Sequence, residues 1–197
     1  MTTLETTPPK KVLAFAIRSE RASDVAARER LLDLCFGEDR ESRTCQRLRD
    51  GRLPAEGLAF TATHRRRLVG TVRLWHVAAG GKDALVLGPL AVEPNLQSAG
   101  IGAALMRHAI TEARGRGHQA IVLLGDAPYY ARFGFAADKA SELVLPGPFE
   151  RERLLGLELV DGALDGAWGM IVPTGAADAR QARDHRGRVK RFAAKVA

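Results

Sequence analysis

The stretch that most constrains this fold is a glycine-containing turn, Gln97-Ser98-Ala99-Gly100-Ile101-Gly102. The apolar run at 84–92 before it predicts a strand, and residues 101–114 after it predict an amphipathic helix. The first amides of a helix have no partner within the helix, and glycine lets an anion approach them closely. The turn therefore indicates an anion-binding site, although a tight strand–helix connection has the same pattern.

Two segments without polar alternation, 84–92 and 120–124, flank the predicted helix. A strand–helix–strand unit of this length is a right-handed crossover, so the two strands are expected to be parallel and covered on both faces. Gly88-Pro89 interrupts the first of them. Proline cannot donate to a strand ladder and glycine weakens it, so the pair predicts a bulge or a local parting of the strands.

The other segments predict further strands and helices around this unit. Residues 68–77 alternate apolar and polar side chains, which is typical of a half-buried antiparallel strand, and 58–63 is its expected partner. Within a helix at 25–36, Leu31, Leu32 and Cys35 are expected to face the core. The remaining expectations are strands at 12–18, 154–160 and 167–172, a highly charged helix at 39–49 and a short helix opened by Asp126.

Length and composition fit one globular domain. The chain has 197 residues, of which 46% are hydrophobic and 27% charged. We expect a disordered segment at 1–11, a domain at 12–174 and a basic tail at 175–197, and the tail carries +5 of the net charge of +7. The domain itself is thus nearly neutral, which argues against a nucleic-acid surface on it.

The sequence predicts neither a membrane span nor a metal site. Its apolar runs are too short to cross a bilayer, and no cleavage site follows 12–17, so we expect a cytoplasmic protein. Cys35 and Cys45 are the two cysteines, and neither lies in a cluster with metal-ligand spacing. A disulfide between them is the less favoured alternative to two free thiols.

The string from Leu87 to Phe135 resembles the core of the GNAT superfamily of N-acetyltransferases. The Gln/Arg-x-x-Gly-x-Gly/Ala motif matches 97–102, and the Tyr-x-x-x-Gly-Phe motif matches 130–135. In element order the resemblance extends from Phe15 to about Val172, and 157–169 is similar to small bacterial acetyltransferases. It implies a single α/β domain whose mixed, mostly antiparallel sheet contains a splayed parallel central pair with flanking helices. It also implies acetyl transfer from acetyl-CoA to a primary amine by direct attack in a ternary complex.

The resemblance implies a set of cofactor-binding residues and one catalytic residue. The cofactor-binding residues would be Leu90, Ala91 and Val92 for the pantetheine arm, Gln97, Ser98, Ala99, Gly100, Ile101, Gly102 and Ala103 for the pyrophosphate, and Asp126 and Phe133 beside them. Tyr130 matches the tyrosine that protonates the leaving thiolate in many relatives. The alternative for Tyr130 is a ring packed on Phe133 with a solvated hydroxyl.

Two positions depart from the pattern of the family. Gly88 stands where many relatives carry a glutamate as general base, and the remaining candidates for a base are Glu93, His76, Glu41 or a chain of waters. Ala99 stands where many relatives have Arg, Lys or Gly. Phosphate binding would therefore depend more on backbone amides than on side-chain charge.

The acceptor amine is not identified by the sequence. By resemblance, Glu41, Arg43, Arg73 and Trp75 are candidates to line its pocket, with exposed charge and core packing as an equal alternative. Two other classes of function stay open: a non-catalytic acyl-CoA-binding module, and a nucleic-acid- or ribosome-associated protein acting through the tail. A second copy of the chain, forming a homodimer, is a further candidate partner.

Overall fold

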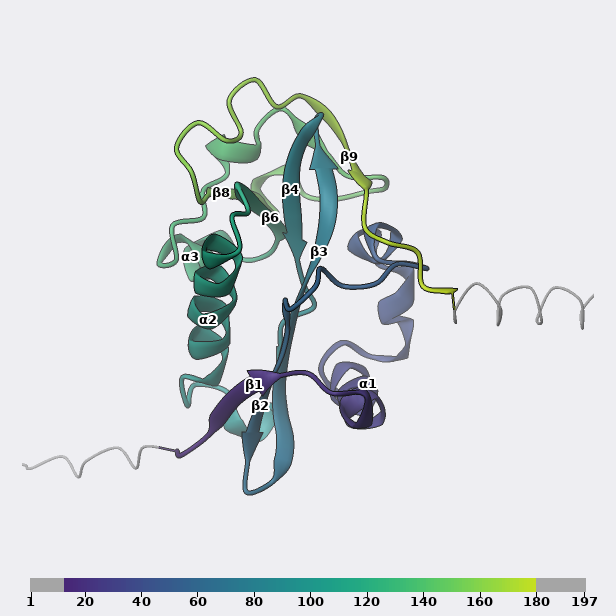
Figure 1. The fold of residues 1–197 in the computed structure, drawn as a ribbon, viewed down its shortest axis with the longest axis vertical. Helices are drawn as coiled ribbons and strands as arrows, with labels where there is room; N and C mark the ends of the chain where they lie inside the picture. Colours follow the sequence, from purple (N-terminus) through teal and green to yellow (C-terminus); the bar gives the residue numbers. More distant parts are fainter. Residues whose placement is uncertain (1–12, 180–197) are drawn as a thin grey trace, which may run out of the picture.

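The computed structural model describes residues 13–179, and its sheet runs through the middle of the molecule with helices on both sides (Figure 1). The expected segment at 1–11 and the tail from 180 lie outside the described residues. The strands are β1 (Ala16–Ser19), β2 (Ala59–His64), β3 (Arg67–Ala79), β4 (Lys82–Leu87), β5 (Ala91–Val92), β6 (Ala120–Leu124), β7 (Leu143–Val144), β8 (Leu154–Glu158) and β9 (Gly169–Pro173). The α-helices are α1 (Val25–Phe36), α2 (Ile101–Gly115) and α3 (Ala127–Ala131), and the longer 3-10 helices are η2 (Glu38–Ser42) and η3 (Thr44–Leu48).

The sheet is mixed and mostly antiparallel, as the sequence predicts. Its main order in the described residues is β1-β2-β3-β4-β6-β8, and along this path only β4 and β6 run parallel. The short strands β5 and β9 pair with β3, and β7 pairs in parallel with β9. The crossover through α2 thus forms the expected parallel pair.

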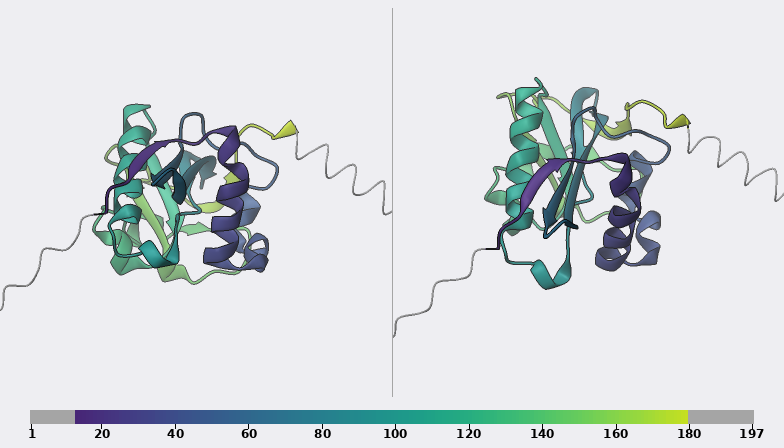
Figure 2. Two further views of the ribbon diagram at one scale, coloured as in Figure 1. Left: turned by 90° about the horizontal axis from the view of Figure 1, so that it is seen from below. Right: turned by 60° about the horizontal axis from the view of Figure 1, so that its bottom comes forward.

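Both faces of the central strands are covered. Leu85 and Leu87 of β4 pack into the cluster that contains the apolar face of α2, whereas Ala84 and Val86 pack into the cluster on the opposite face. In both views of Figure 2, α2 and α1 lie on opposite sides of the sheet. The prediction that 68–77 forms a half-buried strand is wrong. Like β4, β3 lies inside the sheet and is covered on both faces, and Trp75, expected on the exposed face, is only 7% exposed.

The parallel strands part at the predicted place. Pairing between β4 and β6 covers Leu85↔Ile121 and Val86↔Val122, and after the break β5 pairs with β3 and not with β6. Gly88 has φ of 140°, which is unfavourable for other residues, and the peptide bond to Pro89 is cis. Trp75 Nε1 donates to the Gly88 carbonyl at 2.7 Å and supports the break from within the core.

The predicted helix at 39–49 is wrong. The segment forms two 3-10 helices, η2 and η3, because Arg43 between them is extended (φ −67°, ψ 143°). Contacts with a distant loop fix this path: Thr44 Oγ1 donates to the Pro148 carbonyl at 2.5 Å, and Arg47 donates to the Pro146 carbonyl at 2.6 Å. Tertiary hydrogen bonds thus replace the regular helix that local composition favours.

The first residues assigned to the tail are hydrogen-bonded to the domain. Leu53 N donates to the Ala176 carbonyl, and Asp178 N donates to the Gly51 carbonyl, both at 2.8 Å. Arg52 Nη1 also donates to the Gly175 carbonyl. These hydrogen bonds connect residues 175–178 to the segment at 51–53, and the boundary at 174 stays a prediction.

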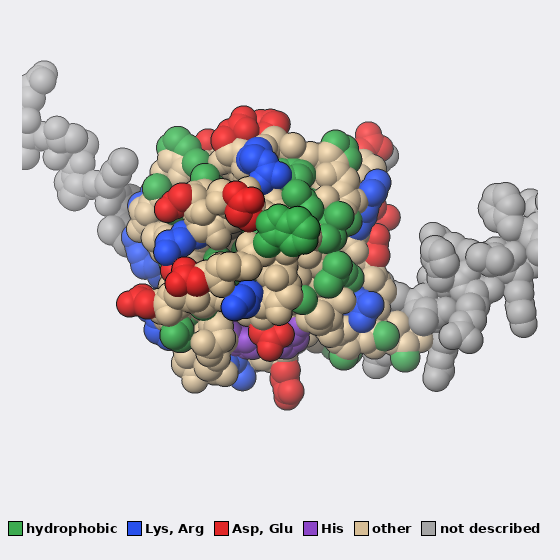
Figure 3. Space-filling view, turned by 90° about the horizontal axis from the view of Figure 1, so that it is seen from above, with side chains coloured by type: hydrophobic (Ala, Val, Ile, Leu, Met, Phe, Trp, Pro, Cys, Tyr) green, Lys and Arg blue, Asp and Glu red, His purple; other side chains and the backbone are tan. Residues whose placement is uncertain are grey.

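Apolar side chains are exposed at one end of the molecule. Trp168 is 75% exposed and Met170 46% exposed, where the chain enters β9. Figure 3 shows apolar side chains gathered among charged ones on the face seen from above. No observation tests the expected homodimer, which stays a prediction.

Within 13–179, no helix has the length and apolar character needed to span a membrane.

A pH-sensitive carboxylate precedes α1. Arg18 donates two hydrogen bonds to Asp24, at 2.6 and 2.8 Å, and the backbone N–H of Arg21 donates a third at 2.7 Å. The hydrogen bonds from Arg18 contribute most to lowering the pKa of Asp24 from 3.8 to about 2. Asp24 therefore stabilises the folded state above about pH 4, and this stabilisation is lost as the pH falls through about 2.

We expect Asp24→Asn to lower the free energy of unfolding by about 1–2 kcal/mol at pH 7 and by much less near pH 2. The substitution removes a charged acceptor at neutral pH, whereas near pH 2 the native carboxyl is already about half protonated and its charge contributes little. Urea unfolding at the two pH values measures the difference. An equal loss of stability at both would contradict this role of Asp24.

Candidate active site

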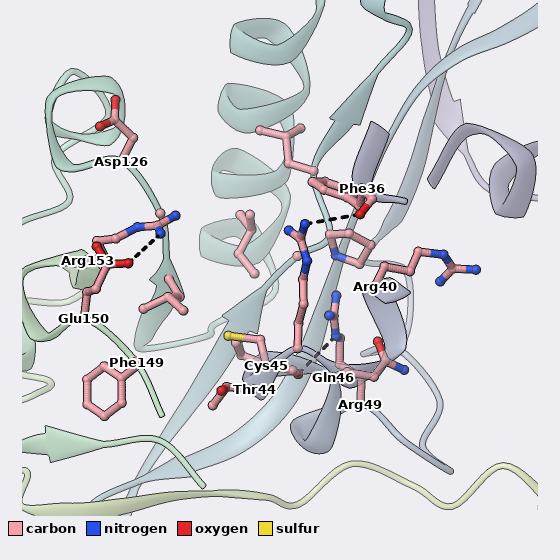
Figure 4. Close-up of a pocket in the computed structure, with 18 of the residues that line it drawn as sticks. Phe36, Arg40, Thr44, Cys45, Gln46, Arg49, Asp126, Phe149, Glu150 and Arg153 are labelled. Carbon is pink, nitrogen blue, oxygen red and sulfur yellow. Dashed lines mark hydrogen bonds and ion pairs between the residues drawn. The ribbon is translucent and has the colours of Figure 1, made fainter. Parts of the chain in front are cut away.

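A cavity of about 860 Å³ opens where β4 and β6 part. Its floor is 86–90, the segment that leads through the break. One wall comes from the end of α1 with η2 and η3, and the other from the end of β6, α3 and the loop at 148–153. Figure 4 shows these two walls, with Arg49 and Cys45 on one side and Glu150 and Arg153 on the other. A volume of this size is typical of small-molecule sites.

The turn before α2 has the expected backbone for binding an anion. Gly100 is the N-cap in the left-handed region (φ 84°, ψ −2°), and Ser98 also has a positive φ of 67°. No side chain caps the helix, and the residues from Gln97 to Gly100 are exposed. The amides of the first turn, residues 101–103, thus have no capping partner within the described residues.

The turn adjoins the cavity without lining it. Tyr129 makes the connection, because its side chain lines the cavity and its hydroxyl lies 3.0 Å from the position of a Cβ on Gly102. Leu90, just before β5, lines the cavity. In β5, Ala91 is buried and the Val92 carbonyl accepts a hydrogen bond from Cys35 Sγ. Among the described strands, only β3 pairs with β5, and the other edge of β5 leads from the cavity toward the turn.

Tyr130 lines the cavity from α3. Its ring packs edge-on against Tyr129 and Phe135 and lies against Gly125 at the end of β6. No hydrogen bond joins its hydroxyl to another described residue. Burial, followed by the charges of Tyr129 and Asp126, raises the pKa of Tyr130 to about 12, so the phenol is protonated at neutral pH.

The two other residues assigned to cofactor binding lie on either side of the tyrosines. Asp126 lines the cavity as the exposed N-cap of α3, and its carboxylate makes no capping hydrogen bond. Phe133 is not part of the cavity wall. Its ring lies beneath the guanidinium groups of Arg107 and Arg132, next to Tyr129.

Of the four residues suggested for the acceptor, only Arg43 lines the cavity. Arg73 is engaged in an ion pair with Glu20 beneath α1, and Trp75 is buried in the core. Glu41 is exposed on η2 and lies outside the cavity wall. Arg73 and Trp75 therefore lie outside this cavity, and their assignment to the acceptor stays a prediction.

None of the residues suggested as general base lines the cavity. His76 faces His118 near the β3–β4 end of the sheet, with ring centroids 5.3 Å apart, and Glu93 lies 3.6 Å from Arg67. The carboxylates in the cavity wall are those of Asp126 and Glu150. In the described residues, no group of three His, Cys, Asp or Glu side chains could hold a metal ion.

Several cavity residues were not predicted to belong to the site. Those with polar, charged or aromatic side chains include Arg40, Cys45, Arg49, Phe149, Glu150 and Arg153. The only sequence signal was the density of charge at 39–49. It indicates an unusual segment but not which of its side chains turn inward.

The comparisons with known proteins agree with this geometry. A family model described as "Acetyltransferase (GNAT) family" matches residues 25–135, from α1 through the cavity to Phe135. The chain belongs to the GNAT acetyltransferase family. The "Uncharacterized N-acetyltransferase YhbS" of Escherichia coli K12 is 29% identical over 157 residues, which cover 79% of this chain and 93% of that protein.

Two GNAT crystal structures resemble the whole domain. Escherichia coli YhbS, solved in complex with CoA, gives a TM-score of 0.70 at 29% identity and covers 85% of this chain and 93% of its own. A GNAT acetyltransferase from Brucella melitensis, solved in complex with acetyl-CoA, gives a TM-score of 0.56 at 28% identity. That match covers 78% of this chain and 99% of the Brucella chain. The GNAT fold expected from the two motifs is thereby confirmed.

Proposed function

We propose that this GNAT protein transfers the acetyl group of acetyl-CoA to a primary amine by direct attack in a ternary complex. The observation that carries the proposal is the cavity at the parted strands, with an uncapped helix start at one end and the Tyr130 hydroxyl in its wall. The crystal complexes of the two relatives with CoA and acetyl-CoA support the choice of donor.

The chain offers acetyl-CoA two kinds of backbone contact. The amides of the first turn of α2, after Gly100, would donate to the pyrophosphate, aided by the positive end of the helix dipole. The unpaired edge of β5 would bind the amide groups of the pantetheine arm as an added strand would. A backbone N–H near Val92 would then polarise the thioester carbonyl.

In the proposed reaction, the nitrogen of the neutral amine attacks the thioester carbonyl carbon and the C–S bond breaks. The sulfur leaves as a thiolate and gains a proton, while the acetylated nitrogen loses one. Complete transfer from a phenol of pKa about 12 to a thiol of pKa about 8.5 is unfavourable by roughly 5 kcal/mol. Tyr130 would therefore stabilise the developing charge on sulfur by a hydrogen bond, and the thiolate's proton would come ultimately from the attacking amine.

A covalent route through Cys45 is disfavoured. Its thiol lines the cavity, but burial raises the pKa of Cys45 and keeps it protonated, which makes it a poor nucleophile. Initial rates at several fixed amine concentrations test this distinction. Direct attack predicts intersecting double-reciprocal lines and full activity in Cys45→Ala, whereas parallel lines and an inactive Cys45→Ala would overturn the proposal.

A further inference from the structure

The structure also bears on which amine is acetylated. Arg49 follows η3 and lines the cavity, and its Nε donates to the Cys45 carbonyl at 3.2 Å (Figure 4). Its Nη1 lies 3.8 Å from the position that a Cβ would occupy on Gly88. The guanidinium therefore stands at the point where β4 ends and the strands part.

Arg49 differs from the other arginines of the cavity wall in combining burial with the lack of a carboxylate partner. Within 13–179, Arg43 also lacks such a partner, but it is exposed and lies over the Phe36 ring. Arg40 forms ion pairs with Glu29 and Asp33, and Arg153 lies 3.4 Å from a Glu150 oxygen. Among the described residues, no carboxylate lies within ion-pair distance of Arg49. Burial lowers the pKa of Arg49, and the opposing effect of the nearby Asp50 does not offset it. An anion brought in by a ligand would supply the missing partner.

The surroundings of Arg49 fit a small organic molecule. Leu32, Phe36, Pro89 and Phe149 provide apolar surface in the same cavity, suited to a hydrocarbon portion. The Tyr130 hydroxyl in the opposite wall marks the expected position of the thioester. A ligand that spans the cavity can thus present an amine to the thioester and an anionic group to Arg49.

We propose that the acceptor is a small aminocarboxylate, such as a free amino acid, whose carboxylate is bound by Arg49. This inference rests on the proposed acetyltransferase function. The planar guanidinium can donate two parallel hydrogen bonds to a carboxylate. A dianionic phosphate fits less well, because the carboxylates of Glu150 and Asp126 also face the cavity. In the described part of the cavity wall, Arg49 is the one half-buried cation that lacks a carboxylate partner.

Paired acceptors test the proposal. We expect wild type to acetylate leucine and phenylalanine with a kcat/KM at least tenfold above isoamylamine and phenethylamine, which lack only the carboxylate. Arg49→Gln should lower kcat/KM for the amino acids roughly 30-fold and leave the simple amines within about threefold. Arg30→Gln, an exposed change of equal charge on α1, is the control and should change neither.

Two results would overturn the assignment while the acetyltransferase function stands. One is a higher kcat/KM for the simple amines, or for O-phosphoethanolamine, than for the amino acids. The other is an equal loss of kcat/KM for both classes of acceptor in Arg49→Gln.

Thermal shift in the presence of CoA gives a readout that does not depend on turnover. Leucine or phenylalanine should raise the Tm of wild type and of Arg30→Gln but not of Arg49→Gln. If the amino acids raise the Tm in this pattern but no amine is acetylated, the carboxylate site is supported and the proposed function fails. If the amino acids do not raise the Tm of wild type, the result counts against the carboxylate site.

Discussion

Replacing Tyr130 by phenylalanine is expected to lower kcat about 100-fold or more and to leave KM for acetyl-CoA nearly unchanged. The ring that packs on Tyr129, Phe135 and Gly125 is retained, so the fold and the cavity should persist. What is lost is the hydroxyl beside the departing sulfur. Steady-state rates with a saturating acceptor measure the effect.

Tyr129→Phe is the matched comparison. The Tyr129 hydroxyl lies beside Gly102 at the start of α2, away from the expected position of the sulfur. We therefore expect a higher KM for acetyl-CoA and a kcat within about threefold of wild type. Full turnover in Tyr130→Phe would show that its hydrogen bond to the sulfur does not contribute to the reaction, and a greater loss of kcat in Tyr129→Phe would transfer that role to the neighbouring tyrosine.

The protonation state of Tyr130 adds a pH criterion. Because its pKa is raised to about 12, the phenol keeps its proton throughout the range in which the enzyme is assayed. Loss of this proton should thus cause no fall in kcat between about pH 7 and 10. A descending limb near pH 8 would show that the hydrogen bond to the sulfur comes from another group, with a lower pKa than Tyr130.

Gly100→Val is expected to weaken acetyl-CoA binding at least about 100-fold. Two or more charge-assisted hydrogen bonds from the first turn of α2 to the pyrophosphate depend on this backbone, and each contributes about 1.5–3 kcal/mol. The space around a Cβ on Gly100 is open in the protein, so the new side chain would enter the region that the pyrophosphate needs. Isothermal titration calorimetry with acetyl-CoA measures the loss.

Backbone strain must be separated from this effect, because valine is unfavourable at a positive φ. Gly117 provides the control, since its φ of 81° is close to the 84° of Gly100 and nothing lies near its Cβ position either. Gly117→Val should cost similar stability and bind acetyl-CoA like wild type. Equal affinity in folded Gly100→Val and Gly117→Val would exclude the turn as the pyrophosphate site.

The parts of the fold that depend on local pattern were predictable. Residues 120–124 are apolar throughout because β6 is covered on both faces, and Gly88-Pro89 parts the strands because neither residue supports a ladder. The turn and the helix after it follow from the glycines and the 3.6-residue periodicity. These features specify the fold and one end of the site without tertiary information.

The acceptor side was not predictable, because distant contacts determine it. The path of η2 and η3 depends on Thr44 and Arg47 binding a loop about a hundred residues later in the chain. That path turns Arg49 inward, while Arg73 is withdrawn from the pocket by Glu20, at the start of the chain. Alternation within 68–77 likewise could not reveal that Leu48 of η3 and the segment at 140–167 cover the second face of β3.

The most direct test of acetyl transfer is to quantify free CoA thiol and N-acetylated product in the same incubation of acetyl-CoA with a panel of amines and amino acids. Wild type should release thiol and form product in equal amounts with at least one acceptor, and Gly100→Val should form neither at the same cofactor concentration. Tight binding of acetyl-CoA by wild type with no product from any member of the panel would contradict the account and identify the domain as an acyl-CoA-binding module.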